Sequence, residues 1–401
     1  MRSRRARVLV LNQYYATTEA SGELLRQLCE ELADEFELEI IAAKAEAGAP
    51  DLPAGAHGRF IKVSRFSRAT SAGRAANYLA FTVGAIAGLV RARRPSVVLC
   101  QTDPPFVGVL GLAVARARGA RLVVITQDIH PEVGEVTGEL RNPVAIALLR
   151  GAQRLIIRYA DHLVAIGDTM RERLIQRGAD PQRLSVISNW VDPGVIWPAP
   201  RVNSFGREHG LVERTVLMHA GNIGKLQALE TVVEAAQALP DMDFVFLGQG
   251  SNQRALADLV ASRRVHNVRM IPFQGRGAVR LALGSADFHL VSLLPGLGGF
   301  LEPSKLYSVL AAGRPVIAAM DQASEAARLI TECDCGIVVD PSDTRALVGG
   351  LRALLEVSHA ERLAMGARGA ELVHADYSRS RASMSYRLLL RRLSAGDGEN
   401  S

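Results

Sequence analysis

Residues 299–319 read Gly-Phe-Leu-Glu-Pro-Ser-Lys-Leu-Tyr-Ser-Val-Leu-Ala-Ala-Gly-Arg-Pro-Val-Ile-Ala-Ala, a polar loop followed by a helix and a strand. Gly313 suits the position just after the helix, where a left-handed backbone ends it, and Pro315 prevents the helix from continuing. The apolar run that follows predicts a buried strand. This stretch therefore predicts one helix–strand unit of an α/β domain.

The same alternation runs through the rest of the chain. Short β-branched runs predict strands, and helical patterns of period 3.6 lie between them, for example over 23–36 and 144–159. The predicted strands are 8–11, 38–41, 97–100, 122–125, 162–166 and 184–187 in the first half, and 215–218, 244–247, 268–271, 288–292, 315–318 and 336–339 in the second. Strands that alternate with helices predict a parallel sheet covered on both faces. We expect two doubly wound, Rossmann-like α/β domains.

The length of 401 residues also fits two domains. The segment 189–200, rich in proline and turn residues, predicts the boundary. We expect a first domain over 1–193 and a second over 194–377. Because ligands of open parallel sheets bind beyond the carboxyl ends of the strands, we expect the two domains to share a cleft. The segment 13–22 lacks G-x-G-x-x-G, which argues against a nicotinamide dehydrogenase.

Composition indicates a globular protein, with 48% hydrophobic and 22% charged residues. The cysteines show neither a zinc spacing nor a secreted disulfide framework, so we expect a reducing cytoplasm; they are Cys29, Cys100, Cys333 and Cys335. The basic segment 1–7 precedes an apolar run too short for a signal peptide. No apolar run approaches the ~20 residues that span a bilayer.

The helix within 299–319 predicts an anion site. Its first turn, at Pro303, Ser304 and Lys305, presents unpaired N–H groups and the positive end of the helix dipole, and the lysine adds a full charge. A phosphate or diphosphate would bind there. An ordinary helix–strand join, without a ligand, is the alternative.

Two glycine-rich turns follow predicted strands. In the first, Gly221 and Gly224 let the backbone approach a ligand, and Lys225 can reach a diphosphate. The second begins with Gly248 and Gln249. The alternative for the first is a structural turn, and for the second a turn in which Ser251 caps the next helix.

The run Pro-Ser-Lys-Leu-Tyr-x-x-Leu-Ala-Ala-Gly-x-Pro-Val-Ile resembles the donor-binding motif of retaining glycosyltransferases of family 4, in particular the bacterial exopolysaccharide branch that includes colanic-acid-type enzymes. The loop Gly-Asn-x-Gly is similar to a second family motif. The resemblance implies a GT-B fold, a UDP- or GDP-sugar as donor, and a last helix near 378–394 that packs back on the first domain. The donor-binding residues it implies are Gly221, Asn222, Gly224, Lys225, Gly248, Gln249, Phe273, Glu302, Pro303, Ser304, Lys305, Leu306 and Ser308.

The chain departs from the family pattern at three positions. Ala228 stands where the glycine loop usually continues with glycine. Most members carry two glutamates around the helix, and these positions are Phe300 and Ser308 here. Glu302 lies two residues from the first and can substitute for it. The loss of the second glutamate leaves open a non-catalytic homologue that binds the donor.

Asp128 and His130 follow the predicted strand 122–125, where a carboxylate and an imidazole can meet a substrate. By resemblance they belong to the active-site loop, and His130 would hydrogen-bond the transferred sugar. The alternative is that Asp128 caps a turn and His130 is a satisfied polar residue. Gly22 lies between the first strand and the first helix, where related enzymes admit the donor phosphate or the acceptor.

We expect no metal and no cofactor beyond the donor substrate. Asp241 and Asp243 spell the Asp-x-Asp that metal-dependent GT-A transferases use, but they follow Pro240 and precede a strand. We interpret them as part of a solvated turn. Without a metal, the helix dipole and cations would stabilise the departing diphosphate.

Basic residues gather in two stretches that lack acidic residues. They flank the apolar run 78–90 and recur at four-residue spacing on a later helix, as Arg65, Arg68, Arg74, Arg91, Arg93, Arg94, Arg150, Arg154 and Arg158. Cations beside apolar surface suit anionic lipid headgroups. A solvated face with a core helix is the alternative. With 5% aromatic residues and none interleaved as stacking platforms, nucleic acid binding is not expected.

We therefore expect a metal-independent, retaining glycosyltransferase on the cytoplasmic face of the plasma membrane, acting on a polyprenyl-diphosphate-linked saccharide in exopolysaccharide or surface glycan synthesis. Lys225 and Lys305 would hold the diphosphate. Two alternatives stay open: a non-catalytic scaffold that binds nucleotide sugars, and a sugar-nucleotide epimerase of the same fold.

Overall fold

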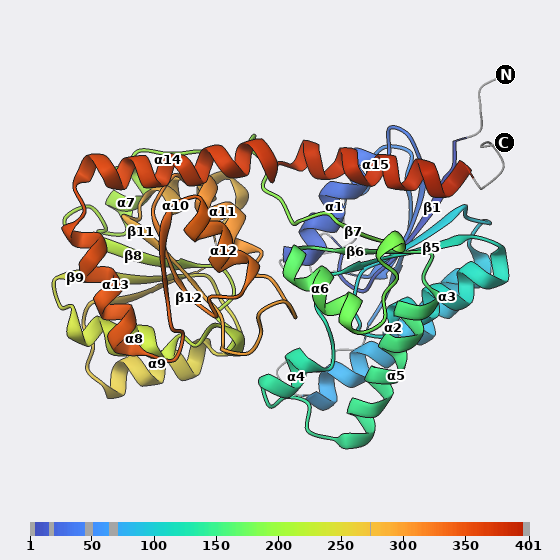
Figure 1. Cartoon of the computed structure of the whole chain (residues 1–401), viewed down its shortest axis with the longest axis horizontal. Helices are drawn as coiled ribbons and strands as arrows, with labels where there is room; N and C mark the ends of the chain where they lie inside the picture. The colour runs from blue at the N-terminus through green and yellow to red at the C-terminus, as the bar shows by residue number, and fades with distance from the viewer. Residues whose placement is uncertain (1–4, 16–19, 45–50, 64–70, 273, 396–401) are drawn as a thin grey trace. The chain divides into compact units, whose positions relative to one another are not determined.

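The computed structural model describes residues 5–15, 20–44, 51–63, 71–272 and 274–395. The chain forms two compact units (Figure 1). The first comprises Met1–Ser188, Gly299–Leu301 and Arg379–Ser401, and the second comprises Asn189–Gly298 and Glu302–Ser378. The boundary between the two units therefore lies after residue 188, whereas we expected it after residue 193.

The sheet of the first unit is parallel throughout, in the order β3-β2-β1-β4-β5-β6-β7. Its strands are β1 (Arg7–Leu11), β2 (Glu37–Ala43), β3 (His57–Ile61), β4 (Val97–Cys100), β5 (Arg121–Thr126), β6 (His162–Ala165) and β7 (Leu184–Val186). Its helices are α1 (Ala20–Leu32), α2 (Ser71–Arg91), α3 (Val107–Arg118), α4 (Glu132–Val136), α5 (Pro143–Tyr159), α6 (Asp168–Gln176) and α15 (Arg379–Ala395), with a 3-10 turn η1 (Pro181–Arg183). The sequence did not predict β3, because this edge strand is polar and only partly buried.

The second unit repeats the topology, with the order β10-β9-β8-β11-β12-β13. Its strands are β8 (Thr215–Ala220), β9 (Met242–Leu247), β10 (Val268–Ile271), β11 (Phe288–Ser292), β12 (Val316–Ala319) and β13 (Gly336–Val339). Its helices are α7 (Ser204–Glu208), α8 (Glu230–Ala238), α9 (Gln253–Ser262), α10 (Arg276–Gly284), α11 (Lys305–Ala311), α12 (Glu325–Glu332), α13 (Thr344–Glu356) and α14 (His359–Asp376), with a 3-10 turn η2 (Lys225–Gln227). The predicted fold class, two doubly wound α/β domains, is confirmed.

The stretch that predicted the fold forms α11 and β12. Gly313 follows the helix with φ +72°, and its N–H donates to the carbonyl of Leu310 at 2.9 Å. A Cβ at this position would also lie 2.9 Å from the side chain of Pro198, so glycine is required for both reasons. β12 then pairs with β11 and β13 in the middle of the sheet.

The core explains why these strands read as apolar runs. Leu217, Phe244, Phe246 and Phe288 are each at most 1% exposed and belong to one cluster with α8, α9 and α13. Helices cover both faces of a parallel sheet, so both faces of each central strand exclude water. At ~25 cal/mol per Å² of apolar area, this burial is the main stabilising contribution to each unit.

The interpretation of Asp243 as part of a solvated turn is wrong. Asp243 lies within β9 and is 1% exposed. Its carboxylate forms ion pairs of 3.1 Å with Arg214 and with Arg269. This buried cluster is structural, since a carboxylate away from water needs such partners. The described residues contain no group of side chains that could hold a metal ion.

Helix α15 belongs to the first unit, where it lies beside α1 (Figure 1). Arg379 bridges Glu30 at 3.1 Å and Glu31 at 3.0 Å, and Arg387 bridges Glu31 at 3.2 Å. The expected last helix near 378–394 is therefore observed over 379–395. No helix in the described part of the chain has the length and apolarity that crossing a bilayer requires.

Candidate functional site

The switch point of the second sheet lies between β8 and β11, where the strand order reverses. Ligands of doubly wound sheets bind at such points, beyond the carboxyl ends of the strands. The glycine-rich turn follows β8, and the connection to α11 follows β11. The N–H of Leu294 donates to the carbonyl of Leu226 at 2.8 Å and joins the two segments.

The two glycine-rich turns are packed against each other. A Cβ on Gly248 would lie 2.0 Å from the carbonyl oxygen of Gly221, and the φ angles of these residues are +146° and +127°. A Cβ on Gly250 would lie 2.3 Å from the carbonyl oxygen of Ile223. Only glycine fits where two backbones approach so closely. The turn before α9 is not capped by Ser251, because the helix begins after Asn252.

Lys305 reaches the first of these turns. Its Nζ lies 3.0 Å from Nε2 of His219, the penultimate residue of β8, and 3.7 Å from where a Cβ on Gly221 would be. Burial lowers the pKa of Lys305 to about 7. Burial, followed by the charge of Lys305, holds the pKa of His219 well below its usual range. A half-buried amine beside the glycine turn is suited to an anionic ligand, which would stabilise its charged form.

The other predicted donor residues lie in the same unit. Lys225 is exposed and begins η2, and the N–H of Gly224 donates to Oε1 of Gln227 at 2.9 Å. Ala228, which departs from the glycine of the motif resemblance, adopts the left-handed conformation with φ +45°. The side chains of Asn222 and Gln249 are exposed.

The helix start differs in detail from the expectation. α11 has seven residues, and Ser304 makes no side-chain capping hydrogen bond. The N–H of Leu306 donates to the carbonyl of Pro303 at 2.9 Å. Glu302 is buried and Ser308 is half-buried. Phe273 lies outside the described residues.

The first unit places Asp128 and His130 directly after β5. The backbone N–H groups of Gln127 and Asp128 each donate to Oγ1 of Thr102 at 3.2 Å, and the N–H of Ile129 donates to the carbonyl of Phe300 at 2.7 Å. These bonds fix the loop at the carboxyl end of the sheet. The alternative in which Asp128 caps the following turn is not observed, since no described backbone N–H donates to its carboxylate.

The two side chains share one small pocket with Thr102, Thr126 and Gln153. Within the described residues, neither the carboxylate of Asp128 nor the ring of His130 makes a hydrogen bond. Burial raises the pKa of Asp128 to about 6. Burial lowers the pKa of His130 to about 4, against an opposing effect of the Glu132 charge. At pH 7 the imidazole is therefore neutral, and the carboxylate is mostly ionised.

Gly22 is not in a loop. It lies in the first turn of α1 and is buried, because the helix begins at Ala20. Residues 16–19 lie outside the described part of the chain, so the expected phosphate or acceptor loop is described only in part.

The predicted basic face is only partly available to a ligand. Arg65 and Arg68, and the side chain of Arg74, lie outside the described residues. Arg93 pairs with Glu37 at 3.0 Å, and Nε of Arg94 donates to the carbonyl of Arg118 at 2.7 Å. The remaining members are exposed: Arg91, which bonds the carbonyl of Ala87; Arg150, which pairs with Glu135; and Arg154 and Arg158, which have no such partner among the described residues.

The sequence predicted apolar surface beside these cations at 78–90, and the structure shows which of its side chains are exposed. Helix α2 exposes a stripe at helical spacing, with exposed fractions from 49% to 73%: Leu79, Val83, Ile86 and Val90. Helix α5 exposes another, of Val144, Leu148, Leu155 and Tyr159. A helical period was visible in both segments, but which face stays uncovered depends on what packs beside it. Sequence reasoning missed His219, because it reads as part of a strand.

Two family models match the chain. The glycosyl transferase 4-like domain matches residues 21–190, and the model of glycosyl transferases group 1 matches residues 214–357. The first match covers mainly the first compact unit, and the second match covers mainly the second. The resemblance read from the donor motif is thereby confirmed.

Similar proteins agree with these matches. The probable glycosyltransferase WbjE of Pseudomonas aeruginosa is 30% identical over 297 residues, 72% of either chain. WcaI of Escherichia coli, which carries the name of a colanic acid biosynthesis glycosyl transferase, is 27% identical over 256 residues, 61% of this chain and 63% of its own. The crystal structure of HepE from Anabaena in complex with UDP-glucose has the same fold, with a TM-score of 0.75 at 14% identity over 96% of this chain and 99% of its own.

Proposed function

Since this chain belongs to the GT-B glycosyltransferases with a family 4-like and a group 1 domain, we propose that it transfers a sugar from a UDP- or GDP-sugar to a polyprenyl-diphosphate-linked saccharide, with retention and without a metal. The product would be an exopolysaccharide or another surface glycan, as the name of WcaI suggests. The UDP-glucose complex of HepE supports a nucleotide sugar as donor.

The observation that carries the proposal is the position of Lys305 beside His219 and Gly221. A diphosphate at the end of β8 would accept charge-assisted hydrogen bonds from the ammonium group. Lys225 would supply a second cation from the exposed side. Both cations oppose the negative charge that develops on the leaving diphosphate, which is the electrostatic contribution that metal ions make in other transferases.

The polar pair of the first unit would act on the sugar or acceptor. His130, neutral at pH 7, can donate to or accept from a sugar hydroxyl without a charge of its own. Asp128, ionised at that pH, can accept a hydrogen bond from the attacking hydroxyl. In a retaining transfer, the bond from the anomeric carbon to the new oxygen forms on the face from which the diphosphate departs.

We propose that the first unit binds the anionic inner surface of the plasma membrane. The exposed apolar stripe of α2 would enter the interface, and exposed arginines such as Arg91 and Arg158 would bind headgroups. Each surface cation contributes on the order of 1 kcal/mol near a charged leaflet. This location would bring the protein to a lipid-linked acceptor.

Binding and turnover of nucleotide sugars test the proposal. Thermal-shift measurements would first identify the donor, and the best ligand would then be incubated with a short-chain prenyl-diphosphate saccharide. We expect nucleotide release and a longer saccharide only when both substrates are present. Donor binding without any turnover would indicate a scaffold, and isomerised or free sugar without the lipid would indicate an epimerase.

A further inference from the structure

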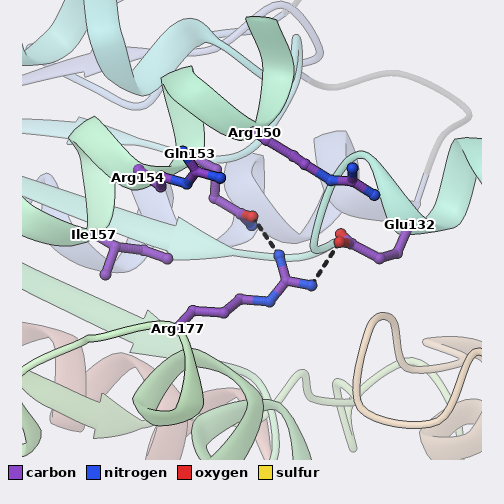
Figure 2. A pocket seen from close by; sticks show the side chains of 6 residues that line it. All are labelled: Glu132, Arg150, Gln153, Arg154, Ile157 and Arg177. Carbon is purple, nitrogen blue, oxygen red and sulfur yellow. Dashed lines mark hydrogen bonds and ion pairs between the residues drawn. The ribbon is translucent and has the colours of Figure 1, made fainter. Parts of the chain in front are cut away.

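A second cavity of about 300 Å³ lies in the first unit, outside the residues that sequence motifs identified (Figure 2). It is lined by Glu132 of α4, by Arg150, Gln153, Arg154 and Ile157 of α5, and by Arg177 just after α6. Such a volume is at the lower end for small-molecule sites. Three of the six lining residues are arginines, which indicates an anionic ligand.

Arg177 is held in place on several sides. Its guanidinium donates to Oε1 of Gln153 at 2.7 Å and pairs with Oε1 of Glu132 at 2.6 Å, as the dashed lines in Figure 2 show. The guanidinium carbon also lies 5.5 Å from the ring centroid of Phe300. The wall formed by Glu132, Gln153 and Arg177 is therefore organised before any ligand binds.

The cavity carries excess positive charge. Arg177 is paired with Glu132, and Arg150 is paired with Glu135 at 2.9 Å. Arg154 has no hydrogen bond or ion pair with any described residue, so one cation at the cavity lacks a carboxylate. Oε2 of Glu132 is buried and has no hydrogen-bond partner in the described part of the chain. A ligand with both an anionic group and a hydroxyl would pair with Arg154 and donate a hydrogen bond to Oε2 of Glu132.

The cavity adjoins the pocket of Asp128 and His130. Gln153 and Ile157 line both, and Glu132 follows His130 after a single proline. A ligand bound at the arginines would therefore place its other end close to the polar pair.

We propose that this cavity binds the phosphate-bearing end of the acceptor. Arg150 and Arg154 bind phosphate oxygens, Glu132 accepts a hydrogen bond from a hydroxyl of the adjoining sugar, and Arg177 positions Glu132. This inference rests on the proposed transferase function for the identity of the ligand, but the phosphate chemistry follows from the cavity alone. The phosphate can come from a prenyl diphosphate or from a free sugar phosphate.

Inorganic pyrophosphate is the first probe, titrated by calorimetry while saturating UDP or GDP occupies the donor site. Arg154→Ala should weaken pyrophosphate binding about tenfold, the usual effect of losing a hydrogen bond to a charged group. Arg158→Ala is the matched control, because this residue lies one turn further along α5, is also exposed and does not line the cavity. Glu132→Gln should tighten pyrophosphate binding, since it removes a negative charge.

Equal effects of Arg154→Ala and Arg158→Ala, or no effect of either, would overturn the inference. Unchanged melting temperatures would show that both variants fold. Farnesyl diphosphate is the second probe, and it separates a prenyl diphosphate from a free sugar phosphate as the source of the phosphate. If farnesyl diphosphate binds more tightly than pyrophosphate, and Arg154→Ala leaves the ratio of the two affinities unchanged, the additional affinity comes from the lipid chain. If no sugar transfer is found but pyrophosphate binding depends on Arg154, the phosphate site stands and the transferase proposal fails. If sugar transfer is found and pyrophosphate binding does not depend on Arg154, the transferase proposal stands and the phosphate site fails.

Discussion

Nζ of Lys305 lies 3.0 Å from Nε2 of His219, and the same ring nitrogen lies 3.2 Å from the carbonyl oxygen of Asn222. One nitrogen cannot both accept a proton from the ammonium and donate one to the carbonyl. Burial lowers the pKa values of both side chains, so the pair carries at most one positive charge near pH 7. A bound diphosphate would restore the ammonium on Lys305 and leave His219 as its acceptor.

Replacement of Lys305 should weaken donor binding. Lys305→Ala removes a charge-assisted contact, and we expect the dissociation constant of the preferred nucleotide sugar to rise between about tenfold and a hundredfold. Calorimetric titration measures this directly. Lys44→Ala, at an exposed lysine of the first unit, serves as control. An unchanged dissociation constant in Lys305→Ala would show that this lysine does not bind the donor.

Donor binding should weaken as the pH rises. The amine of Lys305 in the free protein loses its proton as the pH passes its pKa of about 7, whereas the bound diphosphate needs the ammonium. Binding then takes up a proton, so the dissociation constant should increase roughly tenfold between about pH 7 and about pH 8.5. Lys305→Ala should show a flat profile over this range. The same slope in that variant would assign the titration to another group.

Gly248 should be irreplaceable in its turn. A methyl group there would lie 2.0 Å from a backbone oxygen, so Gly248→Ala must displace the turn after β8. We expect a loss of stability of more than about 2 kcal/mol and no measurable donor binding. Gly349→Ala is the opposite case, because this exposed glycine in α13 has no neighbour within 4 Å of its Cβ position. Urea unfolding should show Gly349→Ala to be more stable by about 0.5–1 kcal/mol.

Ala228 adopts a conformation that favours glycine. Its φ of +45° costs an L-residue about 1–2 kcal/mol, and part of this is regained as lower entropy of the unfolded chain. Ala228→Gly should therefore raise the free energy of unfolding by up to about 1 kcal/mol. Ala257→Gly, on the exposed side of α9, should lower it by a similar amount. Destabilisation by Ala228→Gly would contradict the left-handed geometry.

Membrane binding should depend on the apolar stripe of α2. The double variant Leu79→Ser and Val90→Ser removes side chains that are 65% and 73% exposed, so folding should be little affected. Cosedimentation with phosphatidylglycerol vesicles should fall at least about tenfold, since each large apolar side chain contributes on the order of 2 kcal/mol when buried. Leu388→Ser, at a leucine of α15 that is 56% exposed, should bind vesicles normally. Equal losses of vesicle binding in the α2 double variant and in Leu388→Ser would show that membrane binding does not depend on α2.

Much of the chain was predictable because its information is local. Apolar runs separated by helical patterns gave all strands except β3, whose polar residues lie at the sheet edge. The end of helix α11 was predicted at Gly313 from this glycine and from Pro315 two residues later. Asp243 was misplaced, because its partners Arg214 and Arg269 lie on other segments and no spacing in the sequence reveals the ion pairs.

The sequence by itself determined two parallel α/β domains and the positions of their glycine turns, since backbone geometry and the burial of whole strands depend on neighbouring residues along the chain. Only the tertiary structure decided that Lys305 meets His219 across 86 residues, and that Arg177 joins Glu132 and Gln153 around a cavity. Charge separation, pKa values and cavities arise from distances between side chains in space, and these are fixed only when strands distant in the sequence pair within one sheet.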